Sequence, residues 1–283
     1  MTPSKPKPRT LELEMRIDAP PEAVWRALTE ASELARWFPP IAEGKAGLGE
    51  ELLLSWGPHM EWRTQVVAFE PGRHLVWRDK PPAQLGVSEE GTSSEGKPEA
   101  LSPMAVDWTL ESVGGQVVVR LVQSGFGEGD VWDDFYDGTD FGWRFFLYAL
   151  RHYLQRHRGV KRDMVSIRRP ARGGPSIPWK RVWSAEGFAP TPAAAQLTVG
   201  EPFELKLGPE RLTGTAGYVR APHGFWGTLG SLKDATLLVE MEPGRDLLHC
   251  GIWLSTYGLP PERVQALQRE LTAMADRAFA GMD

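Results

Sequence analysis

The sequence predicts an α+β fold present twice in tandem, each copy a curved antiparallel sheet around a long C-terminal helix. Three observations predict it: apolar and polar residues alternate as in strands, each half ends in an amphipathic helix, and turn residues recur at one offset. The 283 residues suffice for two domains that each bury a core. We expect the first domain at residues 10–158 and the second at 164–283.

The first half begins with a predicted strand in which apolar residues alternate with charged ones from Leu11 to Ile17. Pro20-Pro21 predicts the start of a helix, because the missing proline N–H costs nothing there. A second short helix is expected from Ser32 to Trp37, before another proline pair. These two short helices separate the first strand from the rest of the sheet.

Five further strands are predicted by the same alternation. They cover residues 52–56, 62–68, 75–78, 105–112 and 117–124. Gly114-Gly115 predicts a tight hairpin turn between the last two strands. Residues 80–103 are rich in Pro, Gly, Ser and Glu and predict a long flexible loop.

A long helix is predicted from Asp140 to Arg158. Its apolar face carries Trp143, Leu147, Leu150 and Leu154. An acidic group precedes this helix, at Asp130, Asp133, Asp134, Asp137 and Asp140. The spacing does not match a calcium-binding loop, so we expect these residues to stabilise the helix start, with Asp140 or Thr139 as its cap.

The second half repeats this plan. Gly49-Glu50 matches Gly200-Glu201, and the same offset without a gap matches Pro71 to Pro222. An opening strand at 164–168, paired strands at 235–241 and 247–254, and a closing helix at 260–279 complete the second copy. Because its first helix is shorter and the long loop is missing, we interpret this copy as degenerate.

Composition excludes several classes of protein. The net charge of −5 with mixed signs argues against nucleic acid as a partner. No apolar run reaches the roughly 20 residues of a membrane span, and the basic, proline-rich N-terminus lacks the apolar core of a secretory signal. The single cysteine, Cys250, fits a reducing compartment, and we expect a cytoplasmic protein.

The twelve tryptophans suggest an interior lined with aromatic rings. The candidate ligand-binding residues are Trp37, Trp56, Trp62, Trp77, Trp108, Phe126, Trp143 and Leu147. Such rings stack on flat ligands and offer indole N–H donors, which predicts a small hydrophobic or aromatic ligand. Plain core packing is the alternative interpretation of the same residues.

Other chemistry has weaker support. His59, in a turn beside Gly57-Pro58, is a general-base candidate only if it faces the interior. His152 and His157 are not expected on one helix face, so no metal site is predicted. Cys250 lies in an alternating strand and is interpreted as a buried, inert thiol. No phosphate loop, dinucleotide fingerprint or nucleophile motif occurs, so no cofactor or catalytic residue is assigned.

The first half resembles the START-like, or SRPBCC, helix-grip superfamily, in the branch of homologues of the activator of the heat-shock-protein-90 ATPase. The resemblance rests on three stretches, Ala19–Trp25, Leu28–Phe38 and Phe69–Trp77, together with Ser124-Gly125-Phe126 and Gly142-Trp143. It implies a cavity between sheet and long helix. Members bind lipids, aromatic polyketides or hormones, or assist a chaperone.

Three functions follow as hypotheses. The first is non-enzymatic binding of a small hydrophobic or aromatic molecule in the first domain. The second is a chaperone-accessory protein with a chaperone or other protein partner, and the third is a polyketide-cyclase-type enzyme. An open pocket lined by aromatic residues would favour the binder, and a filled interior would favour the interaction protein. His59 or an Asp buried inside the fold would favour the enzyme.

Overall fold

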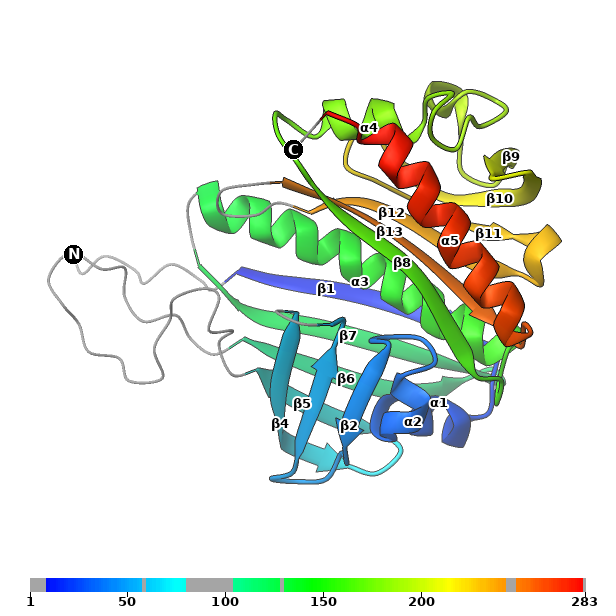
Figure 1. Cartoon of the computed structure of the whole chain (residues 1–283). Coiled ribbons are helices and arrows are strands. Elements are labelled where there is room, and N and C mark those ends of the chain that lie inside the picture. Colours follow the sequence, from blue (N-terminus) through cyan, green and yellow to red (C-terminus); the bar gives the residue numbers. More distant parts are fainter. Residues whose placement is uncertain (1–8, 58–59, 80–103, 128–129, 243–247, 282–283) are drawn as a thin grey trace, which may run out of the picture. The chain divides into compact units, whose positions relative to one another are not determined.

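The computed structural model describes residues 9–57, 60–79, 104–127, 130–242 and 248–281, and these ranges form the ribbon of Figure 1. Two compact units make up the chain, Met1–Gly159 (unit 1) and Val160–Asp283 (unit 2). The predicted loop at 80–103, the N-terminal residues before Arg9 and the candidate His59 lie outside the described residues. No helix among the described residues is both long and apolar enough to cross a bilayer.

The described residues of unit 1 form one antiparallel sheet and three helices. The elements are β1 (Arg9–Ile17), α1 (Pro21–Thr29), α2 (Ala31–Leu34), β2 (Ile41–Gly44), β3 (Glu51–Ser55), β4 (Glu61–Glu70), β5 (His74–Asp79), β6 (Ala105–Val113), β7 (Gln116–Phe126) and α3 (Asp130–Arg156). The strand order is β1-β7-β6-β5-β4-β3-β2, and the short helices follow β1. The helix-grip fold expected for unit 1 is therefore confirmed.

The sheet of unit 1 has one buried face, which packs toward α3 and is called the inner face below (Figure 1). Along β5 and β6, buried residues alternate with exposed or half-buried ones, as expected for a strand covered on one side. Gly114 and Gly115 both have positive φ angles in the turn that joins β6 to β7, as the hairpin prediction required.

The start of α3 differs from the sequence prediction. The helix begins at Asp130, not near Asp140, so the acidic residues lie within its first turns instead of before it. Asp140 pairs with Arg144 one turn later at 2.7 Å, and the Thr139 hydroxyl donates to the carbonyl of Phe135. Neither residue caps the helix. Phe135, Tyr136 and Phe141 continue an apolar helical pattern through the acidic group, which the aspartates obscured.

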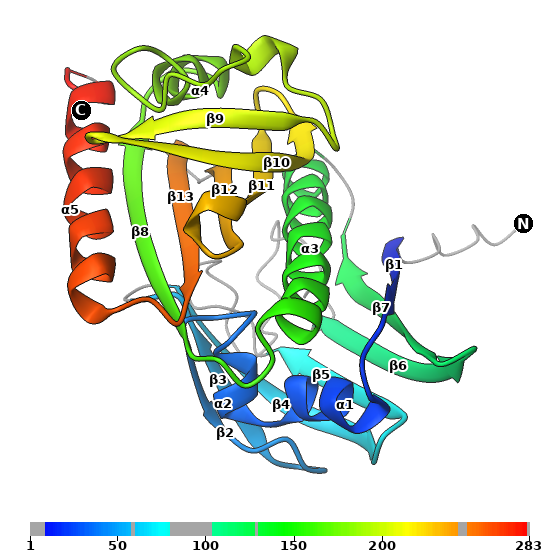
Figure 2. The same ribbon diagram turned by 90° about the vertical axis from the view of Figure 1, so that its right-hand side faces the viewer.

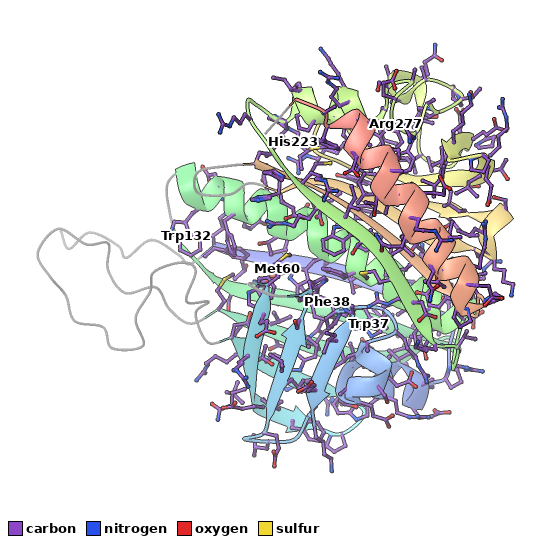
Figure 3. The ribbon with its side chains drawn as sticks, viewed as in Figure 1. Trp37, Phe38, Met60, Trp132, His223 and Arg277 are labelled. Atoms are coloured by element: carbon purple, nitrogen blue, oxygen red, sulfur yellow. The ribbon has the colours of Figure 1, made fainter. Side chains whose placement is uncertain are left out.

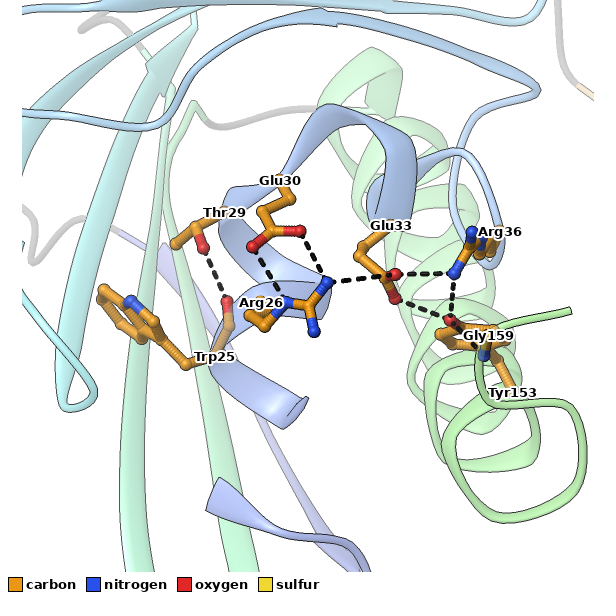
Figure 4. A network of polar contacts seen from close by, with 8 residues as sticks. All are labelled: Trp25, Arg26, Thr29, Glu30, Glu33, Arg36, Tyr153 and Gly159. Carbon is orange, nitrogen blue, oxygen red and sulfur yellow. Dashed lines mark hydrogen bonds and ion pairs between the residues drawn. The ribbon is translucent and has the colours of Figure 1, made fainter. Parts of the chain in front are cut away.

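A polar cluster joins α2 to the C-terminal part of α3 (Figure 4). The Tyr153 hydroxyl donates to Glu33 at 2.6 Å and accepts a bond from Arg36 at 3.1 Å. Arg36 also donates to Glu33 at 2.6 Å, and the Gly159 N–H donates to Tyr153 at 3.0 Å. Burial, followed by the bond to Glu33, raises the pKa of Tyr153. We call Glu33, Arg36, Tyr153 and Gly159 the Tyr153 clamp.

Unit 2 repeats the order of unit 1 with six described strands in its sheet instead of seven, and with α4 (Ser176–Val182) in place of the pair α1 and α2. Its other elements are β8 (Arg162–Ala171), the short turns η2 (Ala194–Gln196) and η3 (Gly230–Leu232), β9 (Pro202–Leu207), β10 (Glu210–Arg220), β11 (Gly224–Leu229), β12 (Ala235–Glu242), β13 (Leu248–Tyr257) and α5 (Pro261–Ala278). The sheet order is β8-β13-β12-β11-β10-β9, and α5 packs along β8 (Figure 2). Two sheet-and-helix units support the tandem duplication.

Each unit has the same backbone hydrogen bond at the equivalent place in its own sheet. The Gly49 N–H donates to Val66 at 2.8 Å, and the Gly200 N–H donates to Ala216 at 2.7 Å. Both receiving strands then show a break in register, after Val66 and after Ala216. The gapless offset predicted from the sequence is wrong beyond β3, because the β9–β10 hairpin closes in a tight turn at Gly208-Pro209 and is one residue shorter.

The Tyr153 clamp predicts a stability change. We expect Tyr153→Phe to lower the free energy of unfolding by about 1–3 kcal/mol, because Arg36 and the Gly159 N–H lose a buried acceptor. Urea denaturation of the full chain measures it. Tyr136→Phe on the same helix removes an exposed hydroxyl and should cost less than about 0.5 kcal/mol. Equal losses in the two variants would contradict the role of the clamp.

Candidate functional site

Eight aromatic rings lie between the sheet and α3 in unit 1. This aromatic cluster consists of Trp37, Phe38, Trp56, Trp62, Trp77, Trp108, Trp143 and Phe146. Neighbouring ring centroids are 4.6–6.3 Å apart, within the range of favourable edge-to-face and offset contacts. The rings come from the α2 tail, from β4, β5 and β6, from the β3–β4 turn and from α3.

Phe38 is the centre of the aromatic cluster. It contacts five of the other rings, at centroid distances of 4.6–6.3 Å, and is labelled with its neighbour Trp37 in Figure 3. The two residues that precede Phe38 fix its position through hydrogen bonds to α1 and α3. The Trp37 indole N–H donates to the Ala27 carbonyl of α1 at 2.8 Å, and the preceding Arg36 belongs to the Tyr153 clamp. Helix placement therefore fixes where Phe38 enters the interior.

Trp77 and Trp108 form the floor of the aromatic cluster on the inner face. Trp77 is opposite Val106, and Trp108 is opposite Leu75, so the two rings are diagonal neighbours on β5 and β6. Their centroids are 5.4 Å apart, and Trp143 of α3 contacts Trp108 at the same distance. The two tryptophans are 1% and 0% exposed. The rings of the aromatic cluster and the residues around them therefore close both tryptophans off from solvent.

Three buried polar atoms on this floor have no hydrogen-bond partner in the part of the chain that the structure describes. They are the indole nitrogens of Trp77 and Trp108 and the hydroxyl oxygen of Thr64. The other deeply placed indoles are satisfied, since Trp143 donates to Gln123 and Trp37 to the Ala27 carbonyl. A buried polar group without a partner costs about 1–3 kcal/mol. A guest with oxygen or nitrogen atoms would recover part of this cost.

Asp79 ends β5 beside these groups. It follows Trp77 by two residues, so its side chain is on the inner face, and it is the strand partner of Thr64. The residue is half-buried. Burial raises the pKa of Asp79 to about 7, and desolvation of the carboxylate is the cause. Among the described inner-face residues of β4, β6 and β7, none has a titratable side chain.

The structure brings six of the eight predicted binding residues into the aromatic cluster. Leu147 is buried on α3, 2% exposed. Phe126 belongs to a separate group with Phe135 and Tyr136, at centroid distances of 6.1 and 4.9 Å, because the early part of α3 covers the end of β7.

Four residues of this region were missed by sequence reasoning. Phe38 lies outside any periodic element, and Phe146 is adjacent to the predicted apolar face of α3. Thr64 and Asp79 are at even spacing from the buried apolar residues of β4 and β5. This spacing could have predicted that both side chains face the inner side of the sheet.

Two other expectations have clear outcomes. Cys250 is buried in β13, and burial raises the pKa of its thiol above the ordinary value, as expected of an inert cysteine. His152 and His157 were expected apart, but their ring centroids are 5.1 Å from each other. His157 directly follows the end of α3 at Arg156, and its N–H donates to the Tyr153 carbonyl at 2.8 Å. The expectation for this pair was wrong.

Comparison with known proteins identifies a family for unit 1. Residues 18–155 match the family described as "Activator of Hsp90 ATPase homolog 1-like protein". No curated protein matches the chain significantly.

Solved structures resemble the chain at low scores. The Aha1 dimer protein from Colwellia psychrerythraea is 21% identical, covers 53% of this chain and 99% of its own, and has a TM-score of 0.43. Protein MLL2253 from Mesorhizobium loti is 26% identical over 53% of this chain and 98% of its own, with a TM-score of 0.42. DynU16, from the dynemicin biosynthetic locus, is 16% identical over 96% of both chains, also at 0.42.

The raised pKa of Asp79 predicts that the free energy of unfolding depends on pH. Its folded-state pKa is above the ordinary value near 4, so the native state loses stability as pH rises from about 4 to about 7. We expect Asp79→Asn to raise the free energy of unfolding at pH 8 by roughly 1–3 kcal/mol and to have little effect at pH 4. Urea denaturation at both pH values measures this difference.

Asp107→Asn is the matched control, because Asp107 is on the outer face and is 3.0 Å from His74. It should give no gain at pH 8. A gain for Asp107→Asn as large as that for Asp79→Asn, or none for Asp79→Asn, would contradict the desolvation of Asp79.

Proposed function

Residues 18–155 form a domain of the Activator of Hsp90 ATPase homolog 1-like family, and from that premise we propose that unit 1 binds a small hydrophobic or aromatic molecule without chemically converting it. The guest would lie between the inner face and α3, against the aromatic cluster. The proposal is carried by the three buried polar atoms without partners on the floor of that cluster.

The energetics favour a flat guest. Burying about 200 Å² of apolar surface contributes about 5 kcal/mol before the cost of ordering the guest. Indole faces add stacking contacts of about 0.5–1.5 kcal/mol each. The indole N–H groups of Trp77 and Trp108 would then select guests that carry hydrogen-bond acceptors, because an acceptor satisfies donors that otherwise remain buried and unpaired.

Binding is preferred to catalysis for a specific reason. An Asp buried inside the fold is a sign of an enzyme, and Asp79 does face inward. Acid–base catalysis of the cyclase type usually needs groups that both accept and return a proton. The described inner-face residues of β4, β6 and β7 offer no second titratable side chain to work with Asp79.

The family description supports one alternative function. Its name refers to an activator of the Hsp90 ATPase, so a chaperone-accessory protein is the second candidate. That function needs a surface for a protein partner and places no demand on the interior of unit 1. The two functions are therefore separated by whether the interior holds a guest.

Native mass spectrometry of the full chain tests the proposal. We expect freshly purified protein, or protein incubated with a panel of lipids and aromatic metabolites, to carry an excess mass that is lost on denaturation. Trp108→Phe should lower the bound fraction at least severalfold, because it removes a buried donor and part of a stacking face. A clean apo mass after incubation would contradict the proposal and favour the chaperone-accessory protein.

Trp183→Phe provides a matched control. Trp183 is buried in the core of unit 2 and its indole nitrogen is also without a partner, so the chemical change is the same. The bound fraction should be unchanged in this variant. Equal losses in the two variants would assign the effect to stability and not to the aromatic cluster of unit 1.

A further inference from the structure

We propose that the guest of unit 1 carries an organic cation, an amine or alkylammonium group on an apolar or aromatic body, and that Asp79 is its counter-ion. This inference rests on the proposed function and specifies the chemical class of its ligand. The cation would lie at the end of the sheet where β4 begins and β5 ends, beside Thr64 and the rings of Trp62 and Trp77.

Strand register places these groups together. Asp79 and Thr64 face each other across β5 and β4, and both are on the inner face. Trp77 precedes Asp79 by two residues on that face, and Trp62 precedes Thr64 by two. Neighbours at this spacing on a sheet are within reach of aromatic side chains. A carboxylate, a hydroxyl and two indoles therefore converge on one small region.

Burial changes across the aromatic cluster in a way that suits a charged end group. Trp37, Trp77 and Trp108 are at most 1% exposed, whereas Trp56, Trp62 and Asp79 are half-buried. An ammonium group at the half-buried end keeps part of its hydration, and the apolar body occupies the drier end. This is how amphipathic side chains lie in protein interiors.

Asp79 differs from the other partly buried carboxylates of unit 1 in having no basic side chain as a partner among the described residues. Glu33 pairs with Arg36, Asp107 with His74, and Asp140 with Arg144. No ion pair or hydrogen bond to the Asp79 side chain exists among the described residues, and desolvation is the cause that raises its pKa. A desolvated carboxylate is costly unless a counter-ion pairs with it. A cationic ligand would supply that partner.

The surroundings favour an organic cation over a metal ion. Divalent cations require several oxygen ligands, and the described residues of this region offer one carboxylate and one hydroxyl. Indole faces instead attract alkylammonium groups through their quadrupole, by about 0.5–2 kcal/mol at such sites. Trp77 and Trp62 are two residues from Asp79 and Thr64 on the same strands, so their indoles are the aromatic groups within reach of such a cation.

Isothermal titration calorimetry at pH 8 tests the inference with two probe series of matched shape. Each series contains a cation, a neutral alcohol and an anion: benzylammonium, benzyl alcohol and benzoate, and the corresponding 2-naphthyl compounds. We expect the cation to bind at least about tenfold more tightly than the alcohol, and the anion most weakly. Asp79→Asn should bring the cation and alcohol affinities within about twofold of each other, because it removes the counter-ion.

Two further variants control for the fold. Asp79→Glu keeps the carboxylate and should retain a preference for the cation. Asp107→Asn removes a carboxylate from the outer face and should leave the preference unchanged. Circular dichroism with thermal unfolding confirms that each variant is folded under the titration conditions.

The outcomes separate this inference from the proposed function. If the alcohol binds and the cation binds no better, the counter-ion role of Asp79 is wrong, while ligand binding by unit 1 stands. If the cation preference survives in Asp79→Asn, the inference is equally overturned. If no probe of either series binds, both the inference and the proposed function are contradicted.

Discussion

The hydroxyl of Tyr153 is the interaction on which the interior of unit 1 depends. It joins Glu33 and Arg36 of the α2 segment to the long helix α3, with contacts of 2.6 and 3.1 Å. The residues after Arg36 are Trp37 and Phe38, and Phe38 contacts five other rings. The polar clamp at the side of the domain thus sets the position of the ring at the centre of the aromatic cluster.

The alternation of side chains along each strand is the second constraint on the interior of unit 1, because it decides which residues face the aromatic cluster. The same alternation that buries Leu75 and Trp77 also turns Asp79 inward, where burial raises its pKa to about 7. Likewise, Thr64 follows Trp62 on β4. The sheet therefore places a hydroxyl and a carboxylate beside the aromatic rings, at the end where β4 begins and β5 ends.

Much of this architecture could be predicted from the sequence, because periodicity reports it directly. The paired strands, the Gly114-Gly115 turn and the tandem arrangement depend on local patterns that tertiary contacts reinforced. The start of α3 was predicted too late, because aspartates interrupt an apolar helical pattern at its N-terminus. Phe38 could not be predicted as the central ring, since its position depends on contacts distant in sequence and not on any period.

The central claim is that the unpaired donors on the floor of the aromatic cluster are binding groups for a guest. A high-resolution crystal structure of the protein with the guest recovered by native purification tests it most directly. The account predicts ordered density between the inner face and α3, with acceptor atoms at about 2.9 Å from the indole nitrogens of Trp77 and Trp108. Both indoles packed only against side-chain carbon, with the guest bound elsewhere, would contradict it.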